Sequence, residues 1–215
     1  ERWRDRAYLV EKIGSIMCDV EVGAYNDSSE RLSISFEQYS QYLDMWEESG
    51  KGALPKEQVL YLAQNDLPST LIEDIEIPSI CEYPTPAVSK GKLYHVKLWM
   101  GPTKCVSPLH HDPLDNFLMQ IVGRKRVYVI DHDETLVDCD DSSALYFGER
   151  YEQQNNTSAV DVENPNLEKY PRFRSMLPYI ASATLEPGDA LFIPSQCWHA
   201  ARSLEYSISV NVWLR

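Results

Sequence analysis

A histidine and an aspartate separated by a single residue form the most informative short motif of the chain. His110 and Asp112 lie within the sequence SPLHHDP of residues 107–113, directly before an apolar run. In an extended strand, residues i and i+2 point to the same face, so these two side chains converge while His111 turns away. The motif therefore offers one imidazole and one carboxylate to a single metal ion.

A third candidate ligand, His199, follows 87 residues after Asp112 (199 − 112) and comes directly after Trp198. Two imidazoles and one carboxylate on one side of an ion make up the facial triad of non-haem Fe(II) oxygenases, which leaves positions open for a chelating cosubstrate and for oxygen. Iron is therefore the expected metal, and the alternative for His199 is a core histidine packed beside Trp198. No ligand role is expected for the remaining histidines, His95, His111 and His132.

The second half of the chain has the pattern of a series of short strands. From residue 93 onward, runs rich in Val, Ile, Tyr and Trp are separated by Gly, Pro and Asp. Many short strands of this kind are typical of a β-sandwich or barrel. An acidic insertion at 131–169 is expected to cross the rim of the barrel. The predicted strands are 93–100, 116–122, 125–130, 181–185, 190–194 and 206–214.

The first 92 residues are expected to add flanking elements to this β core. Apolar spacing predicts a helix from Trp3 to Met17 that ends near Gly14 or soon after, a short strand at 18–23 and a second helix at 36–46. Five prolines between residues 55 and 86 predict a strand and short helical turns over 59–83. The 215 residues suffice for one domain with a single core, so we expect one domain over 1–215.

Charge and composition limit the kinds of partner that the chain can take. It has 20 Lys and Arg against 33 Asp and Glu, and the net charge of −13 disfavours nucleic acid and favours a basic partner. The alternative is that the acidity only maintains solubility.

No stretch is apolar enough to cross a bilayer. Five cysteines without a C-x-x-C pair indicate a reducing compartment, so the glycosylation sequons at Asn26, Asn155 and Asn156 carry no weight. Because the chain starts at Glu1 and not at Met, we expect a trimmed N-terminus.

Taken together, these motifs resemble the JmjC-domain oxygenases, most closely the arginyl-hydroxylase branch formerly described as histone lysine demethylases. The resemblance implies a double-stranded β-helix of the jelly-roll, cupin-like type, in agreement with the strand-rich half. It also implies Fe(II), 2-oxoglutarate and O2, with His110, Asp112 and His199 holding the iron. The residues that carry it span nearly the whole chain: VEVG at 20–23, YLAQ at 61–64, residues 107–117, GRK at 123–125, DVENP at 161–165, LFIP at 191–194 and WH at 198–199.

The same resemblance assigns residues to the 2-oxoglutarate pocket. It implies that Lys125 binds the distal carboxylate with help from Tyr61 and Ser107. It further implies that Asn116 assists the carboxylate near the metal and that Trp213 closes the pocket behind the iron. The alternatives are a turn-capping role for Ser107 and core packing for the two aromatic residues.

The spacing around Lys125 supports its assignment. Lys125 lies 13 residues past Asp112 (125 − 112), on the strand that follows the Gly123 turn. A buried ammonium there could meet a dianionic cosubstrate. Alternation makes Lys125 face opposite to both Arg124 and Arg126, so one of the two directions must point inward. The alternative is an ordinary exposed strand lysine.

For the substrate, the resemblance points to Glu21 and Trp99 as the carboxylate and the aromatic wall that receive a guanidinium. The alternatives are a surface glutamate and a core tryptophan. The sequence departs from the branch at His111 and Asp115, where the branch has Gln, and at Asn211, where it has a small residue. Related JmjC oxygenases act on tRNA bases, lysines or asparagines, so kinship alone leaves the substrate open.

Three functions follow from these residues. The first is an oxygenase that hydroxylates arginyl side chains of a basic protein inside the cell, in the nucleus or the cytoplasm. The second is a histone lysine demethylase, which would need room for a methylammonium cage and would release formaldehyde. The third is a non-catalytic JmjC scaffold, against which the intact triad and Lys125 argue. The oligomeric state is not predicted.

Overall fold

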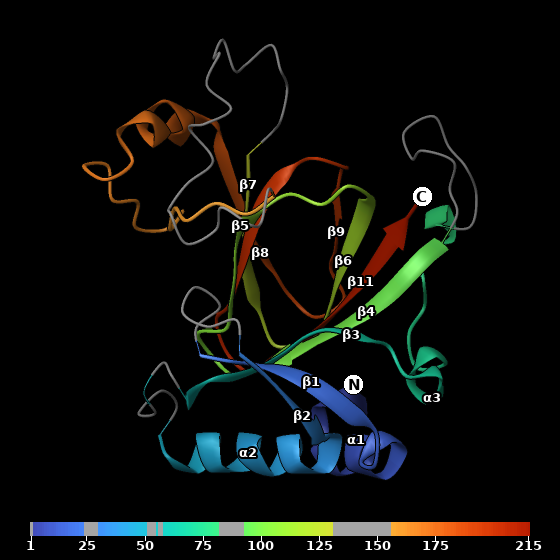
Figure 1. Cartoon of the computed structure of the whole chain (residues 1–215). Coiled ribbons are helices and arrows are strands. Elements are labelled where there is room, and N and C mark those ends of the chain that lie inside the picture. The colour runs from blue at the N-terminus through green and yellow to red at the C-terminus, as the bar shows by residue number, and fades with distance from the viewer. Residues whose placement is uncertain (1, 24–29, 51–54, 56–57, 82–92, 131–155) are drawn as a thin grey trace.

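Two facing β-sheets make up the body of the molecule in the computed structural model (Figure 1). The structure describes all residues except 1, 24–29, 51–54, 56–57, 82–92 and 131–155. The larger sheet has seven strands in the order β2-β1-β3-β4-β11-β6-β9, and the smaller has four in the order β5-β10-β7-β8. Within the described residues, every pairing between these strands is antiparallel. The jelly-roll architecture predicted from the sequence is confirmed.

The strands after residue 93 form the core of both sheets. The larger sheet receives β4 (Leu93–Gly101), β6 (Asp115–Val122), β9 (Ala190–Ile193) and β11 (Ser207–Leu214). The smaller sheet is built from β5 (Val106–His110), β7 (Lys125–Ile130), β8 (Ile180–Leu185) and β10 (Trp198–Ser203). The six predicted strands recur with ends displaced by at most one residue. Strands β5 and β10 lie outside the predicted set, because β5 contains a proline and β10 has no β-branched residue.

The elements before residue 93 pack against the larger sheet or extend it. The helix predicted from Trp3 begins later, at Arg6, because Asp5 caps it by accepting a hydrogen bond from the backbone N–H of Ala7 (3.0 Å), and it ends near Gly14 as predicted. The elements are η1 (Arg2–Arg4), α1 (Arg6–Ile13), β1 (Met17–Val22), β2 (Arg31–Ser35), α2 (Phe36–Glu48), β3 (Leu60–Asp66), α3 (Ser69–Ile72) and η3 (Ser79–Cys81).

Helix α2 lies beneath β1 and β2 in Figure 1 and closes the core on that side. It begins with a capping box: the Ser35 hydroxyl accepts from the Gln38 backbone N–H (3.2 Å), and the Gln38 side chain accepts from the Ser35 backbone N–H (3.0 Å). Phe36, Tyr39 and Leu43 share one helix face and are buried. Burial of each such side chain contributes about 1.5–3 kcal/mol. The predicted helix at 36–46 is confirmed.

Alternation along β11 gives the larger sheet an apolar face and a polar face. Ile208, Val210, Val212 and Leu214 join the core formed with the N-terminal helices. Ser209, Asn211 and Trp213 point the other way, toward the smaller sheet, and this side is called the inner face. Opposite them on the neighbouring strands lie Trp99, Lys97 and His95 of β4, and Gln120, Leu118 and Asn116 of β6.

The connection between β7 and β8 is described only in its second part. Residues 131–155 of the predicted insertion, including His132 and Cys139, lie outside the described residues. Residues 156–169 contain an isolated antiparallel bridge between His110 and Thr157, and the chain then forms η6 (Pro171–Tyr179). In the described part of the chain, no helix is long and apolar enough to span a membrane. The four described cysteines are buried, and Cys18 and Cys105 are free thiols.

Candidate metal centre and cosubstrate pocket

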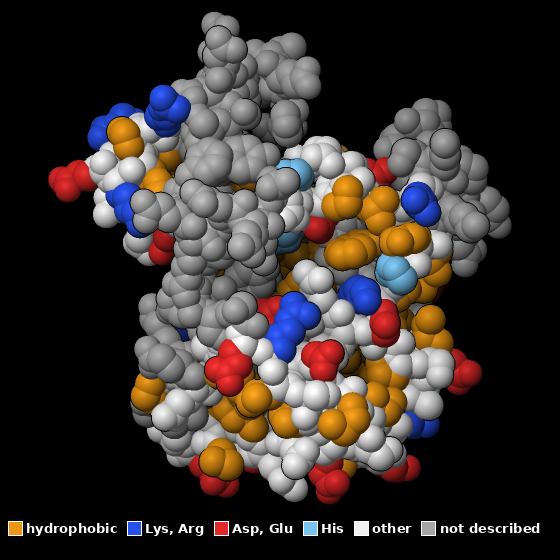
Figure 2. Space-filling view, viewed as in Figure 1, with side chains coloured by type: hydrophobic (Ala, Val, Ile, Leu, Met, Phe, Trp, Pro, Cys, Tyr) orange, Lys and Arg blue, Asp and Glu red, His pale blue; other side chains and the backbone are white. Residues whose placement is uncertain are grey.

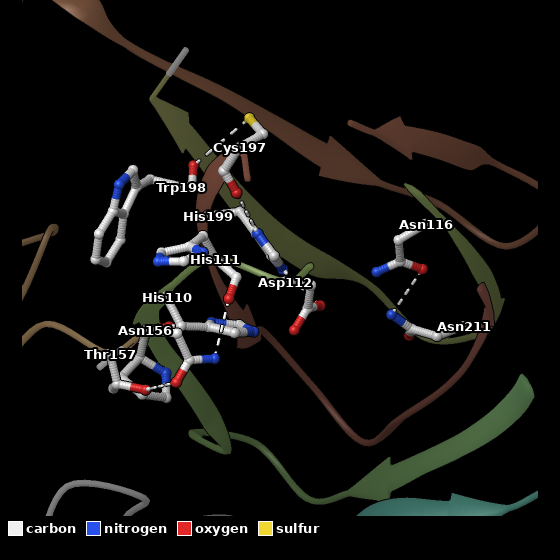
Figure 3. Close-up of polar contacts among 11 residues, drawn as sticks. His110, His111, Asp112, Asn116, Asn156, Thr157, Cys197, Trp198, His199 and Asn211 are labelled. Carbon is white, nitrogen blue, oxygen red and sulfur yellow. Dashed lines mark hydrogen bonds and ion pairs between the residues drawn. The ribbon is translucent and has the colours of Figure 1, made fainter. Parts of the chain in front are cut away.

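The smaller sheet brings the three predicted metal ligands together. His110 ends β5 and His199 lies in β10, and the antiparallel register places these two residues opposite each other. Asp112 follows in the turn after β5. One ligand atom from each residue lies within 4.8 Å of the others, and His199 Nε2 is 3.8 Å from Asp112 Oδ2. Figure 3 shows the three side chains converging on one point.

Backbone carbonyls orient both imidazoles in the same way. Nδ1 of His110 is 2.7 Å from the Pro108 carbonyl oxygen, and Nδ1 of His199 is 3.0 Å from the Cys197 carbonyl oxygen. With Nδ1–H donating to these carbonyls, each Nε2 keeps its lone pair for a metal. In both cases the ring nitrogen bonds to the carbonyl of the residue two positions earlier in the chain. The two Nε2 atoms can therefore bind a divalent ion without rearrangement.

The electrostatics of the triad suit a cation. Burial, together with the neighbouring His110, lowers the pKa of His199 to about 3. His199 is therefore neutral at physiological pH, which is the form that binds metal. Burial also raises the pKa of the Asp112 carboxyl, against the opposing effect of His110. A bound cation would favour the ionised carboxylate and reverse that shift.

The loop before β10 holds the turn that carries Asp112. The backbone N–H of Gln196 donates to the Asp112 carbonyl oxygen (2.8 Å), and the backbone N–H of Ser195 donates to Asp115 Oδ1 (2.8 Å). His111 turns away from the triad, as predicted, and its ring meets the Trp198 ring edge-on with centroids 4.7 Å apart. The neighbours of the ligands are thereby fixed by packing and by backbone hydrogen bonds.

Lys125 is a buried cation without an ion pair in the described part of the chain. It is 3% exposed, and its Nζ lies 3.3 Å from the Tyr61 hydroxyl oxygen and 5.9 Å from the centroid of the Trp99 ring. Burial lowers its pKa to about 8. Its neighbour Arg124 points out and pairs with Glu205, so alternation directs the lysine inward. A buried ammonium in such surroundings favours an anionic ligand.

Unpaired polar atoms gather on the inner face of β4, β6 and β11. Asn211 Nδ2 donates to Asn116 Oδ1 (3.0 Å), which leaves one donor and one acceptor of this amide pair open toward the triad in Figure 3. Together with Lys125, the row provides mainly donors, as a dicarboxylate requires. The buried atoms without a hydrogen-bond partner among the described residues on these strands are Trp99 Nε1, Asn116 Nδ2, Gln120 Oε1, Ser209 Oγ, Asn211 Oδ1 and Trp213 Nε1.

The sequence indicated only part of this row. Asn116 and Trp213 come from the family resemblance, and Asn211 stands out there only as a departure from the family. Gln120 and Ser209 receive no role from the sequence, although polar residues at every second position of the apolar run SISVNVWL could have revealed the face. Predicted Ser107 is buried on β5 and pairs with Ala201 of β10.

The predicted substrate residues lie in different surroundings. Glu21 is 9% exposed and lies opposite Tyr61 across β1 and β3, yet its Oε1 already pairs with Arg31 Nη2 at 2.9 Å. Burial raises the pKa of Glu21, and Arg31 opposes that shift. Trp99 packs beside Tyr61, with ring centroids 5.8 Å apart, and so lies at the Lys125 end of the pocket.

The metal centre lies apart from the groove along α1 and α2. Figure 2 shows histidine side chains at the surface between the sheets, with hydrophobic side chains gathered to their right, over β4 and β11. A separate groove of about 930 Å³ lies by α1 and α2 and includes Arg6, Glu47 and Tyr206. None of the triad residues lines that groove.

Comparison with known proteins agrees with this geometry. A family model described as a cupin-like domain matches residues 1–215. Lysine-specific demethylase 8 of Danio rerio is 38% identical, over 96% of this chain and 47% of that protein. JmjC domain-containing protein D of Dictyostelium discoideum is 32% identical, over 97% and 46%. Lysine-specific demethylase JMJ30 of Arabidopsis thaliana is 30% identical, over 99% and 46%.

These relatives are longer than the chain, which spans about half the length of the curated proteins that it matches. A shorter match, tRNA wybutosine-synthesizing protein 5 of Gallus gallus, is 33% identical over 66% of this chain and 38% of that protein. The matches to the JmjC proteins extend over nearly the whole chain. The chain belongs to the cupin-like JmjC family of Fe(II)- and 2-oxoglutarate-dependent oxygenases.

Proposed function

We propose that this protein is an Fe(II)- and 2-oxoglutarate-dependent oxygenase that hydroxylates arginyl side chains of a basic protein. The observation that carries the oxygenase part is the convergence of His110, Asp112 and His199, with both Nδ1 atoms bonded to carbonyls and both Nε2 atoms left for metal. Three ligands on one side of the ion leave room for a chelating cosubstrate and O2.

In this proposal, Lys125 binds the distal carboxylate of 2-oxoglutarate. The ammonium is buried beside the Tyr61 hydroxyl, where a charge-assisted hydrogen bond is strong. Ser107 assists at the same end. Asn116 donates its open amide hydrogens to the carboxylate near the metal, and Trp213 closes the pocket behind it. These contacts hold the cosubstrate in one orientation before the reaction.

When bound, iron, 2-oxoglutarate and O2 supply the oxidation that converts a C–H bond into C–OH, with one oxygen atom entering the substrate and the other entering the succinate formed as CO2 leaves. The side chains of this protein position the cosubstrate and the substrate. The apolar walls formed by Trp99 and Trp213 limit the access of water.

The proposal for the substrate rests on Glu21. A carboxylate that is largely buried and already pairs with one guanidinium has the geometry to bind another in its place, and a planar guanidinium suits it better than a point-like ammonium. Trp99 would provide the adjoining aromatic surface. The net charge of −13 would speed the encounter with a basic partner. The buried free thiols of Cys18 and Cys105 support a site of action inside the cell, in the nucleus or the cytoplasm.

Lysine demethylation is the second candidate, because two of the relatives carry the name lysine-specific demethylase. The test is incubation of the iron-loaded protein with 2-oxoglutarate and two peptide sets, one containing Arg and one containing methyl-Lys. A gain of one oxygen on Arg supports the proposal. Loss of a methyl group with formaldehyde release would establish the second candidate instead, and 2-oxoglutarate turnover without either product would leave the oxygenase class but reject both substrates.

A further inference from the structure

The strand that leads to the metal ligands lies at an edge of the smaller sheet. β5 pairs with β10 along one side, where His110 faces His199. Its other side would present unpaired backbone groups next to the triad. Residues 156–158 lie there, and they come from the middle of the β7–β8 connection. A segment remote in sequence therefore completes the pairing of the ligand strand.

The backbone contacts of this segment are those of a short antiparallel pair. The N–H of His111 donates to the Asn156 carbonyl oxygen (3.0 Å), and the N–H of Ser158 donates to the Leu109 carbonyl oxygen (2.7 Å). Between these two bonds, Thr157 forms the bridge to the ligand strand. On the ligand strand these contacts involve only Leu109, His110 and His111, so they hold the backbone at the first metal ligand.

The side chain of Asn156 supplies one more bond to the same place. Its Nδ2 donates to the His111 carbonyl oxygen (3.0 Å), while its Oδ1 accepts from the Thr157 hydroxyl (3.4 Å). The hydroxyl contact sets the orientation of the amide, with its hydrogens toward His111, as Figure 3 shows. One asparagine thus satisfies both the N–H and the C=O of the residue between two metal ligands.

We propose that Asn156 is a positioning residue for the metal centre, an inference that rests on the metal site of the proposed function. His110 and Asp112 can converge only while His111 between them stays extended. Asn156 fixes His111 from one side, and Gln196 fixes the Asp112 carbonyl from the other. Loss of the amide leaves the His111 carbonyl without its donor and lets the two ligands drift apart.

Substitution at Asn156 should act on metal binding through geometry. Residues that orient metal ligands typically change metal affinity by about 10–100-fold when they are removed. We expect N156A to weaken Co(II) binding about tenfold. N156D should weaken it at least as much, although its size is nearly the same, because a carboxylate cannot donate to the carbonyl and repels it. The visible absorption of bound Co(II) should also change, because it reports the ligand arrangement.

A matched control is available in the same connection. Asn166 lies in an exposed turn, where its Oδ1 accepts from the backbone N–H groups of Glu168 (3.1 Å) and Lys169 (2.9 Å). N166A removes two local hydrogen bonds without touching the ligand strand. We expect its Co(II) affinity and spectrum to equal those of the unaltered protein.

Titration of the full chain with Co(II), at a temperature where circular dichroism shows every variant folded, decides the matter. The inference is supported if both Asn156 variants lose affinity with an altered spectrum while N166A does not. It is overturned, and the triad retained, if the Asn156 variants match the unaltered protein while H110A loses the metal. Weaker binding with an unaltered spectrum, shared by N166A, would show general loss of structure and also overturn it. Failure of the unaltered protein to bind Co(II) would reject the metal site as well.

Discussion

The metal end and the Glu21 end of the molecule are prepared for ligands in opposite ways. At the metal end, every ligand is oriented by the chain but keeps its binding atom open: both histidines use Nδ1 for a carbonyl and leave Nε2. At the other end, one carboxylate oxygen of Glu21 is already engaged, because Arg31 pairs with Oε1 at 2.9 Å.

In the proposed function, the difference separates a site that is ready to bind its ligand from one that must first exchange a partner. A preorganised site costs little rearrangement when the metal binds. A preoccupied carboxylate must exchange one guanidinium for another, so only a partner that matches or exceeds Arg31 can displace it. Lys125 resembles the metal end, because it is buried and has no ion pair in the described part of the chain.

The largest expected effect is at the triad. His110→Ala or Asp112→Ala should abolish iron binding and 2-oxoglutarate turnover, because an open-sided site depends on each ligand and the loss should exceed the roughly 10–100-fold typical of outer residues. His95→Ala serves as a control at a histidine outside the triad. Metal titration and succinate formation measure the result. Normal turnover by either ligand variant would break the assignment of the metal end.

The next effect concerns Lys125. Lys125→Ala should weaken 2-oxoglutarate binding by about 10–100-fold, because it removes a charge-assisted hydrogen bond of about 1.5–3 kcal/mol. Metal affinity should be unchanged. Calorimetry on the Mn(II)-loaded protein, with Arg124→Ala as the matched control, measures this. If Lys125→Ala binds normally and Arg124→Ala does not, the distal carboxylate lies outside the inner face.

A dependence on pH follows from the same lysine. Because burial lowers the pKa of Lys125 to about 8, the free protein loses this positive charge as the pH rises through that value. Binding of 2-oxoglutarate requires the charged form, so affinity should be constant below pH 7 and fall by up to about tenfold per pH unit above pH 8. Lys125→Arg should remain charged and flatten the profile. An identical slope in that variant would assign the titration to another group.

How much of this could be read from the sequence depended on whether a residue acts along one strand or across several. The convergence of His110 and Asp112 follows from alternation alone, whereas alternation shows only that Lys125 faces opposite to Arg124 and Arg126, and not which of them points inward. The meeting of β5 with β10 needs the register between strands far apart in the chain, and this was supplied by family resemblance, not by periodicity. The strand boundaries were accurate for the same local reason.

What the sequence could not give were contacts that depend on tertiary placement. Neither the pairing of Glu21 with Arg31 nor the amide bond from Asn211 to Asn116 leaves a sequence pattern, because each joins side chains on different strands. The helix predicted from Trp3 begins only at Arg6, because apolar spacing alone does not reveal the N-cap at Asp5. Asn156 resembled a glycosylation sequon, and its bonds to His111 become visible only in the fold.

The smallest expected effects come from the Glu21 end, and they have opposite signs. Glu21→Ala should reduce hydroxylation of an Arg peptide while 2-oxoglutarate binding is spared. Arg31→Ala should increase peptide affinity, because it frees the carboxylate from its internal partner. The Arg31 side chain is 57% exposed, so the pair is worth about 0–1 kcal/mol and the gain should not exceed about fivefold.

Arg31→Lys is the matched control for this last comparison, since it keeps the charge but not the planar guanidinium. Its peptide affinity should lie between those of the unaltered protein and Arg31→Ala. Peptide KM at two salt concentrations measures all three variants, and any gain from Arg31→Ala should shrink as salt rises because a bare carboxylate attracts a basic peptide partly through long-range charge. A rise in peptide KM for Arg31→Ala, matching that for Glu21→Ala, would mean that the pair only stabilises the β1–β2 hairpin. The substrate guanidinium would then have to be received elsewhere on the inner face.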